Sequence, residues 1–133
     1  MLFEYQIKTT KREELVDITS YVISAISQSK VKDGIAVIYA PHTTSGIIIN
    51  ENADPSVKYD IINFLSYLIP KNWNFTHLEG NSDAHIKSSL IGCSQTVIIK
   101  DGKPLLGTWQ GIFFAEFDGP RLRKFYVKII ENK

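Results

Sequence analysis

The stretch GIAVIYA at residues 34–40 is followed by PHTTS at residues 41–45 and by GIII at residues 46–49. Runs of β-branched and aromatic residues on both sides of a short polar segment are typical of two strands joined by a tight connection. Successive positions in both runs are apolar, which is the pattern of strands covered on both faces. The stretch therefore predicts a fold built around buried β-sheet.

Further strands are predicted along the whole chain. They fall at residues 2–9, 95–100, 104–106, 111–117 and 122–130, where β-rich runs are bounded by turn residues. We find no internal repeat, no low-complexity tract and no linker-like stretch in the sequence. We therefore predict a single domain over residues 1–133.

Helices are predicted at residues 11–29, 55–69 and 82–91, the last of them short and closed by Gly92. Asp54 and Pro55 suit the N-cap and first position of the second helix, and Ser82 or Asp83 suits the cap of the third. The predicted buried stripe of the second helix is Val57, Ile61, Phe64, Leu65 and Leu68. The expected fold class is α+β, a sandwich of β-sheet with two longer helices and one short helix.

The composition argues for an ordinary globular protein. The chain has 44% hydrophobic residues, and 15 lysines and arginines against 14 acids leave a net charge of +1. This near-neutral balance gives no electrostatic reason to expect nucleic acid or a membrane surface as a partner. The first residues lack the features of a secretory signal, and a single cysteine allows no internal disulfide, so we expect a cytoplasmic protein. Cys93 itself is expected as a small buried residue.

The apolar strands also bear on assembly. Besides residues 34–40 and 46–49, the run Ile112-Phe-Phe-Ala115 is apolar on both faces. Two long helices cannot easily cover two faces of a sheet, so a second sheet or another subunit is needed to cover the rest. We therefore expect an oligomer.

All three histidines lie in polar segments next to Gly, Pro, Asn or acids, where a rigid scaffold can direct loop side chains to one point. His42 interrupts two buried strands, so it is a candidate anion contact, although a capped turn explains the same pattern. His85 is expected in the first turn of the third helix, where a neutral imidazole and free amides favour a phosphate or a metal. The spacing of His77 and His85 is not a standard metal motif, and each can also be an ordinary surface histidine.

Arg121 follows the turn Asp118-Gly-Pro120 and can clamp a phosphate or carboxylate, or simply pair with a neighbouring acid. Glu51 closes the strand whose other end leads back to His42. Trp109, between Gly107 and Gly111, is expected in the core or at an interface rather than against a ligand.

Taken together, these segments resemble the YjbQ-like family, also labelled secondary thiamine-phosphate synthase. The resemblance covers nearly the whole chain, and its carriers are residues 42–45, 50–55, 77, 81–85, 106–111 and 118–121, which include the segment Leu106-Gly-Thr-Trp-Gln-Gly111.

The resemblance implies an α+β sandwich that forms a homotrimer with polar sites near subunit boundaries. It implies that His42, His77 and His85 gather around a divalent metal such as zinc, or around an anion. It also implies a weak activity that joins a pyrimidine pyrophosphate to a thiazole phosphate and releases pyrophosphate. The expected catalytic residues are Glu51, His85 and Arg121. The expected ligand-binding residues are Thr43, Thr44, Ser45, Asn50, Asn81, Thr108, Gln110 and Arg121.

Three hypotheses stay open at this point. The first is an enzyme that uses a metal on the three histidines, with Glu51 or Glu79 as base or fourth ligand. The second is a binding protein that holds a small phosphorylated metabolite in the same pocket without chemistry. The third is a structural trimer whose histidines satisfy an interface. The sequence contains neither a Gly-rich phosphate loop nor an acid-rich cluster suited to Mg²⁺.

Overall fold

The computed structural model describes residues 1–133 and confirms the α+β class. In chain order the elements are β1 (Leu2–Lys8), β2 (Glu14–Asp17), α1 (Thr19–Ser29), β3 (Asp33–Tyr39), β4 (Ser45–Glu51), α2 (Pro55–Leu68), α3 (Ser82–Ile91), β5 (Ser94–Lys100), β6 (Lys103–Pro104), β7 (Gln110–Glu116) and β8 (Leu122–Glu131). The strands form one sheet in the order β1-β8-β3-β5-β6 and a second in the order β2-β7-β4. All strand pairs are antiparallel.

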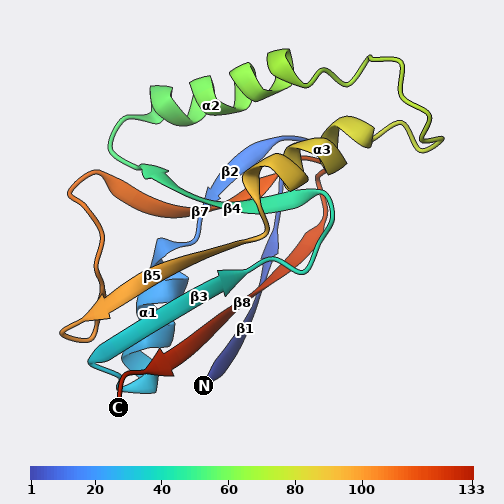
Figure 1. Ribbon diagram of the computed structural model, residues 1–133. Coiled ribbons are helices and arrows are strands. Elements are labelled where there is room, and N and C mark those ends of the chain that lie inside the picture. The colour runs from blue at the N-terminus through green and yellow to red at the C-terminus, as the bar shows by residue number, and fades with distance from the viewer.

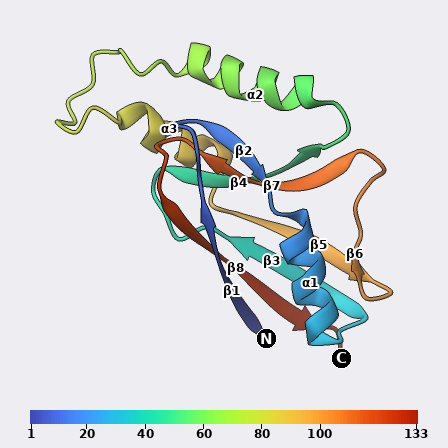
Figure 2. The same ribbon diagram turned by 180° about the vertical axis from the view of Figure 1, so that it is seen from behind.

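The main hydrophobic core lies between the two sheets and α1. Val22, Ala25 and Ile26 of α1 pack there with Ile38 of β3 and Phe114 of β7, all of them fully buried. Figures 1 and 2 show α1 beside the five-stranded sheet, with the three-stranded sheet crossing above. The predicted second sheet therefore does cover one face of the apolar strands.

The three-stranded sheet is covered on its other face by helices. Ala115 and Phe117 point away from the main core and form a smaller cluster with Ala84 of α3. Ile62 and Leu65 of α2 pack against the same cluster. The continuous apolar run of β7 is thus explained inside one chain, because a sheet lies on one side and two helices lie on the other (Figure 1).

The first predicted helix is wrong over its opening residues. Residues 14–17 form strand β2, which pairs with β7, and α1 begins only at Thr19. The carboxylate of Glu14 accepts hydrogen bonds from the main-chain N–H groups of Thr10 and Lys11, which closes a turn where a helix was expected. Asp17 then accepts the N–H of Thr19 and takes the place of a helix cap.

The second helix has the predicted start but not the predicted buried stripe. The Asp54 side chain accepts the N–H of Ser56, and Pro55 occupies the first turn. No residue of α2 is buried, and Phe64 and Leu68 are 61% and 56% exposed. The helix rests on the sheet through Ile62 and Leu65, so its neighbouring apolar flank stays uncovered.

The outer face of the five-stranded sheet is also open. Ile35 of β3 pairs with Ile130 of β8 and Ile98 of β5 in the strand register, and the last two are 46% and 55% exposed. Tyr39 and Tyr126 stack beside them with ring centroids 6.5 Å apart. The chain alone therefore leaves an apolar sheet face uncovered, as the two-sided pattern of β3 predicted.

The expectation for Cys93 is wrong, and the expectation for Trp109 is narrowed from the core or an interface to an interface. Cys93 is exposed rather than buried, because it directly follows Gly92 in the turn between α3 and β5. Trp109 is 62% exposed, so it does not belong to the core of the chain. None of the three helices is both long enough and apolar enough to cross a membrane.

Candidate functional site

A polar pocket of about 440 Å³ lies where the β3–β4 connection, the start of α3 and the β7–β8 turn meet. No hydrophobic residue lines it. Its lining residues are Pro41, His42, Thr43, Thr44, His77, Glu79, Asn81, His85, Asp118, Arg121 and Arg123. The three histidines of the chain therefore converge on one pocket within a single subunit, together with two arginines.

His42 is held in place by the main chain of β8. Its Nε2 lies 3.1 Å from the nitrogen and 3.0 Å from the oxygen of Lys124, so this ring nitrogen is occupied. Nδ1 is then the atom left for a ligand. Burial lowers the pKa of His42 from its ordinary value of 6.5, and the positive charge of Arg123 lowers it further. His42 therefore enters the pocket as a neutral imidazole at neutral pH.

The second imidazole, His85, is positioned by close packing of α3 on β4. A Cβ atom at Gly46 would lie 2.8 Å from the main-chain oxygen of Gly92, so a glycine is needed where the strand meets the end of the helix. Ser88 of α3 donates a 2.6 Å hydrogen bond to the main-chain oxygen of Ser45. These contacts fix the position of α3 relative to the connection that carries His42.

The start of α3 is anchored by a buried ion cluster. Asp83 is fully buried and accepts hydrogen bonds of 3.1 and 3.0 Å from the guanidinium of Arg12 and one of 3.0 Å from Lys87. Burial by itself raises the pKa of Asp83, but the bonds from Arg12 and Lys87 outweigh it and lower the pKa. Asp83, proposed from the sequence as a helix cap, is instead the centre of this cluster, and Asn81 is the N-cap residue.

His77 and His85 lie next to each other in the wall of the pocket. Their ring centroids are 5.5 Å apart and the rings are nearly perpendicular. Glu79 lies 3.9 Å from Nε2 of His77 at the surface, with 74% of its side chain exposed. The two imidazoles and this carboxylate line the pocket and can form hydrogen bonds to a ligand in it.

Arg121 is aimed by the turn that precedes it. Its Nε donates to the main-chain oxygen of Asp118 at 3.0 Å, and one terminal nitrogen donates to the Asp118 carboxylate at 3.1 Å. Asn81 donates to the same carboxylate oxygen at 2.8 Å. Half of the Arg121 side chain is exposed, so the rest of the guanidinium faces the pocket with free donors.

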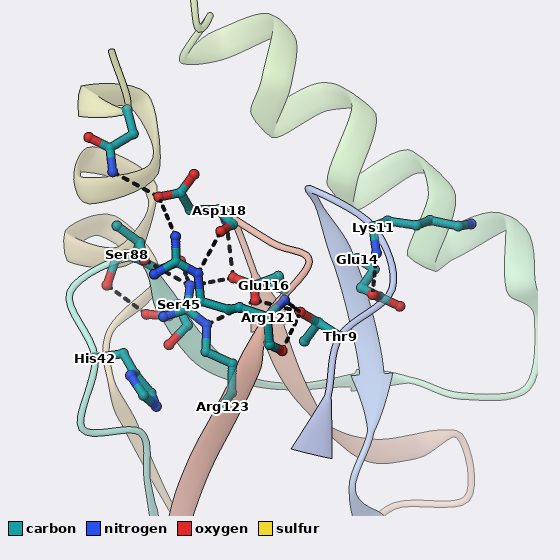
Figure 3. A network of polar contacts seen from close by, with 12 residues as sticks. Thr9, Lys11, Glu14, His42, Ser45, Ser88, Glu116, Asp118, Arg121 and Arg123 are labelled. Atoms are coloured by element: carbon teal, nitrogen blue, oxygen red, sulfur yellow. Dashed lines mark hydrogen bonds and ion pairs between the residues drawn. The ribbon is translucent and has the colours of Figure 1, made fainter. Parts of the chain in front are cut away.

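The second arginine, Arg123, belongs to a buried network shown in Figure 3. It forms a two-pronged ion pair with the carboxylate of Glu116, which is completely buried. It also donates to the Thr44 hydroxyl at 2.8 Å, and Thr9 donates to Glu116 at 2.8 Å. The network ties β7, β8 and the β3–β4 connection together beneath the pocket.

The pocket residues do not fit the expected zinc site. No group of three or more His, Cys, Asp or Glu side chains in the chain is arranged to hold a metal ion. The pocket is better suited to an anion, since two guanidinium groups and three imidazoles line it.

Comparison with known proteins identifies the family. A family model described as UPF0047 protein YjbQ-like matches residues 3–132. The chain belongs to the YjbQ-like UPF0047 family. It is 88% identical over 133 residues to UPF0047 protein MJ1081 of Methanocaldococcus jannaschii, a match that covers 100% of this chain and 96% of the relative. It is 51% identical to UPF0047 protein YugU of Bacillus subtilis, with 98% and 99% of the two chains covered.

Solved structures of YjbQ-like proteins share the fold. An uncharacterised conserved YjbQ/UPF0047 protein from Clostridium acetobutylicum superposes with a TM-score of 0.95 at 56% identity, over 96% of this chain and 99% of that one. A protein of unknown function from Sulfolobus solfataricus gives a TM-score of 0.95 at 30% identity, over 99% and 97% of the two chains. The predicted family and fold are therefore confirmed.

The segments that carry the YjbQ-like resemblance divide between two ends of the three-stranded sheet. Ser45 and Glu51 are the two ends of β4, about 20 Å apart in an extended strand of this length. The pocket lies at the Ser45 end, although Ser45 itself is fully buried beneath it. Four predicted site residues lie at or beyond the far end: Asn50, Glu51, Thr108 and Gln110.

Those four residues are thus not brought together with the histidines in one subunit. Glu51 accepts the N–H of Asp54 at 3.2 Å, and the Gln110 side chain accepts the N–H of Gly107 at 2.8 Å. Both side chains therefore have a local role in closing loops. Of the predicted residues, the pocket contains His42, Thr43, Thr44, His77, Asn81, His85 and Arg121.

Sequence reasoning missed Arg123 and undervalued Asp118. Arg123 alternates with the buried residues Phe125, Val127 and Ile129 of β8, so it stands at an inward position of the strand. A charged residue on the core-facing side of a strand needs a buried partner, and this pattern was the available signal. For Asp118, the turn motif marked the place but gave no sign of its bonds to Asn81 and Arg121.

Proposed function

We propose that this protein binds the phosphate or pyrophosphate group of a small metabolite in the polar pocket. The observation that carries the proposal is the lining, which contains two arginines and three histidines but no hydrophobic residue. Arginine is the side chain best matched to phosphate oxygens, and the imidazoles add ring N–H groups that can donate to them. Of the two carboxylates in the lining, Asp118 already accepts from Asn81 and Arg121, and Glu79 is largely exposed at the surface.

Arg121 is the main phosphate contact in this proposal. A guanidinium has five N–H donors, and two of those of Arg121 are used by Asp118. The others are free to form paired bonds with phosphate oxygens. Arg123 lies deeper and is committed to Glu116 and Thr44, so it holds the Thr44 segment in place beneath the pocket.

The chemistry that fits such a site is group transfer with departure of pyrophosphate. We infer an activity like that of secondary thiamine-phosphate synthases, in which a pyrimidine pyrophosphate joins a thiazole phosphate and pyrophosphate is released. Negative charge grows on the leaving group as its bond breaks, and fixed positive charge and N–H donors lower the energy of that state. Arg121 would hold the leaving group, and His85 would donate a proton to it.

A non-catalytic binding protein is the second candidate. It is favoured by the position of Glu51, the expected base, which lies at the opposite end of β4 from the pocket. Without that carboxylate, the pocket retains its phosphate-binding groups but has only the histidines and Glu79 for proton transfer. Under this proposal the protein holds a phosphorylated metabolite and does not transform it.

Self-association as a homotrimer is part of both candidates. The support from this chain is its uncovered apolar surface, which includes Ile98 and Ile130 on the five-stranded sheet. Phe64 and Tyr67 on α2 add exposed aromatic rings at 61% and 78%. Surfaces of this kind are typical of contacts between subunits.

Calorimetric titration with inorganic pyrophosphate tests the proposed function. The wild-type protein should bind it, and Arg121→Ala should weaken binding at least tenfold, since a charge-assisted bidentate contact is worth about 1.5–3 kcal/mol. Because half of the Arg121 side chain is exposed, the unliganded variant should keep its melting temperature. Lys100→Ala removes the same charge at the far end of β5 and is the matched control.

Equal weakening in Arg121→Ala and Lys100→Ala would mean that only the overall charge attracts the anion, and this would contradict the proposed site. Incubation with the two phosphorylated reactants then separates the candidates. Release of pyrophosphate by wild type but not by His85→Ala supports the enzyme, whereas tight binding without release supports the binding protein.

A further inference from the structure

A second hollow adjoins the polar pocket. It has a volume of about 410 Å³ and is lined by His42, Thr43, His85, Ser88, Ser89, Gly92 and Cys93. Three of these residues, His42, Thr43 and His85, line the first pocket as well. The two imidazoles therefore stand on a shared wall, with a hollow on each side.

The two hollows differ in charge. The first contains Arg121, Arg123, Asp118 and Glu79. The second contains no Lys, Arg, Asp or Glu, and its walls are hydroxyl, thiol, imidazole and main-chain groups. An ionised phosphate would gain no counter-charge in the second hollow, whereas an uncharged polar group loses little on entering it.

Two of the three hydroxyl groups of the second hollow, those of Ser88 and Ser89, are oriented by the protein. Ser88 donates to the main-chain oxygen of Ser45 at 2.6 Å, and Ser89 donates to the main-chain oxygen of His85 at 2.9 Å. The protons of these two serine hydroxyls are thus committed, and their oxygen lone pairs remain as acceptors. The hollow therefore favours a group that brings its own N–H or O–H donors.

From these observations we propose that the site is bipartite, with the second hollow holding the uncharged, hydrogen-bond-donating part of the phosphorylated ligand. This inference rests on the proposed function of the first pocket. The phosphate lies against Arg121, the uncharged part lies beside Ser88, Ser89 and Cys93, and the bond between them passes over His42 and His85. The ligand class is a phosphate ester or pyrophosphate of a neutral ring that carries an amino or hydroxyl group.

Cys93 provides a direct test, because it is the single cysteine of the chain, is exposed and lines the second hollow. The rate of its reaction with the neutral reagent N-ethylmaleimide is measured at pH 7.5 in three samples: protein alone, with inorganic phosphate, and with 3-aminobenzyl phosphate. Both ligands are used at saturation as determined by calorimetry. The ester should slow the reaction at least fivefold, and inorganic phosphate should change it less than twofold.

A blocking variant gives an independent readout. Ser89 is exposed on α3, so Ser89→Phe can fill the hollow without disturbing the core. It should weaken binding of 3-aminobenzyl phosphate at least tenfold and leave the affinity for inorganic phosphate within twofold. Leu90→Phe, at the neighbouring position that is 61% exposed and outside the hollow, should change neither affinity.

The outcomes separate this inference from the proposed function. If phosphate binds but the ester and phosphate affect Cys93 equally, or if Ser89→Phe leaves ester affinity unchanged, the second hollow is not a subsite and only the bipartite site is overturned. If neither phosphate nor pyrophosphate binds the wild-type protein, both the proposed function and this inference fail.

Discussion

At the scale of single residues, the site depends on side chains whose freedom is removed by the main chain or by buried partners. His42 is fixed by Lys124 of β8, and Arg121 is fixed by Asp118. Arg123 is fixed by Glu116 beneath the pocket. Such preorganisation matters for anion binding, because groups that are already aimed at the ligand lose little entropy when it binds.

The lowered pKa of His42 predicts a pH dependence of stability. In the unfolded chain the imidazole takes up a proton near pH 6.5, whereas the folded protein resists protonation until a lower pH. As pH falls below about 6.5, the unfolded state therefore gains protons first and stability is lost until the folded pKa is passed. Urea unfolding at pH 7.5 and pH 5.0 should show a smaller loss for His42→Gln than for wild type.

The measurement stays at or above pH 5.0 to exclude the titration of Asp17, Asp54 and Asp83. Their pKa values are lowered from 3.8 in the folded protein, so their effect on stability falls near and below pH 3.8. An equal loss for the wild-type protein and the variant would contradict the assignment of a buried neutral imidazole at position 42.

The sequence allowed most pocket residues to be found but not their partners. His42, His77 and His85 were identified because each stands in a polar segment, and the structure brings them to one pocket. The bond of His42 to Lys124 joins residues 82 positions apart, and no local pattern predicts such a pairing. For the same reason the sequence could not show that Glu51 lies away from the histidines.

At the scale of elements, α3 is the part of the fold that builds the site. It contributes His85, lies against β4 through the close approach of Gly46 and Gly92, and is anchored at its start by Asp83. The helix has little amphipathic character to hold it otherwise, since its buried residues are Asp83, Ala84, Lys87 and Ser88. Polar contacts therefore hold α3 in place, whereas most helices are held by an apolar stripe.

Breaking the buried cluster should be costly. Asp83→Ala leaves Lys87, whose side chain is 1% exposed, with Glu13 as its remaining partner, so the free energy of unfolding should fall by about 3–5 kcal/mol. Glu4→Ala breaks an ion pair with Lys124 whose side chains are 50% and 41% exposed, and should cost less than about 1 kcal/mol. Urea denaturation of both variants at pH 7.5 measures the difference. Similar small losses in the two would show that Asp83 does not anchor α3.

Strands were predicted from the sequence better than helices, for a physical reason. A run rich in β-branched and aromatic residues predicts a strand from its own composition. The predicted strands match β3, β4, β5, β7 and β8 to within a few residues. Leu15 and Val16 instead fit both a helical stripe and a short strand, and pairing with β7 decided between them. Phe64 and Leu68 of α2 were predicted to be buried because the sequence shows that they are apolar. It does not show that no other part of the chain packs against them.

At the scale of the whole molecule, one chain covers the three-stranded sheet on both faces but leaves the five-stranded sheet open on one. The open face contains Ile98, Ile130 and the stacked pair Tyr39 and Tyr126. Ile130, Ile35 and Ile98 form an apolar row in register across β8, β3 and β5, with Lys128 and Thr96 on either side of Val37 in the next row. Contact with other copies would remove the apolar row from water. The two hollows lie beyond the ends of these strands, around α3 and the β7–β8 turn.

We expect a trimer with three times the 15.1 kDa mass of the chain, measured by sedimentation velocity at micromolar concentration. Replacing Ile98 and Ile130 together by Asp should shift the protein toward monomer, since charges placed on an apolar contact lose hydration without gaining partners. Leu78→Asp adds a charge at a fully exposed loop position and should leave the mass unchanged. A stable wild-type monomer would contradict the trimer.

The most direct test of the phosphate pocket uses the three histidines themselves. The chain contains only His42, His77 and His85, and all three line the pocket, so imidazole ¹⁵N and ¹H resonances report on it without interference from other histidines. Titration of the labelled protein with inorganic pyrophosphate at pH 7.5 should shift the resonances of all three along one saturable binding curve, and Arg121→Ala should move that curve to at least tenfold higher concentration. Histidine resonances that stay in place while pyrophosphate binds elsewhere, or that shift without saturation, would contradict the account.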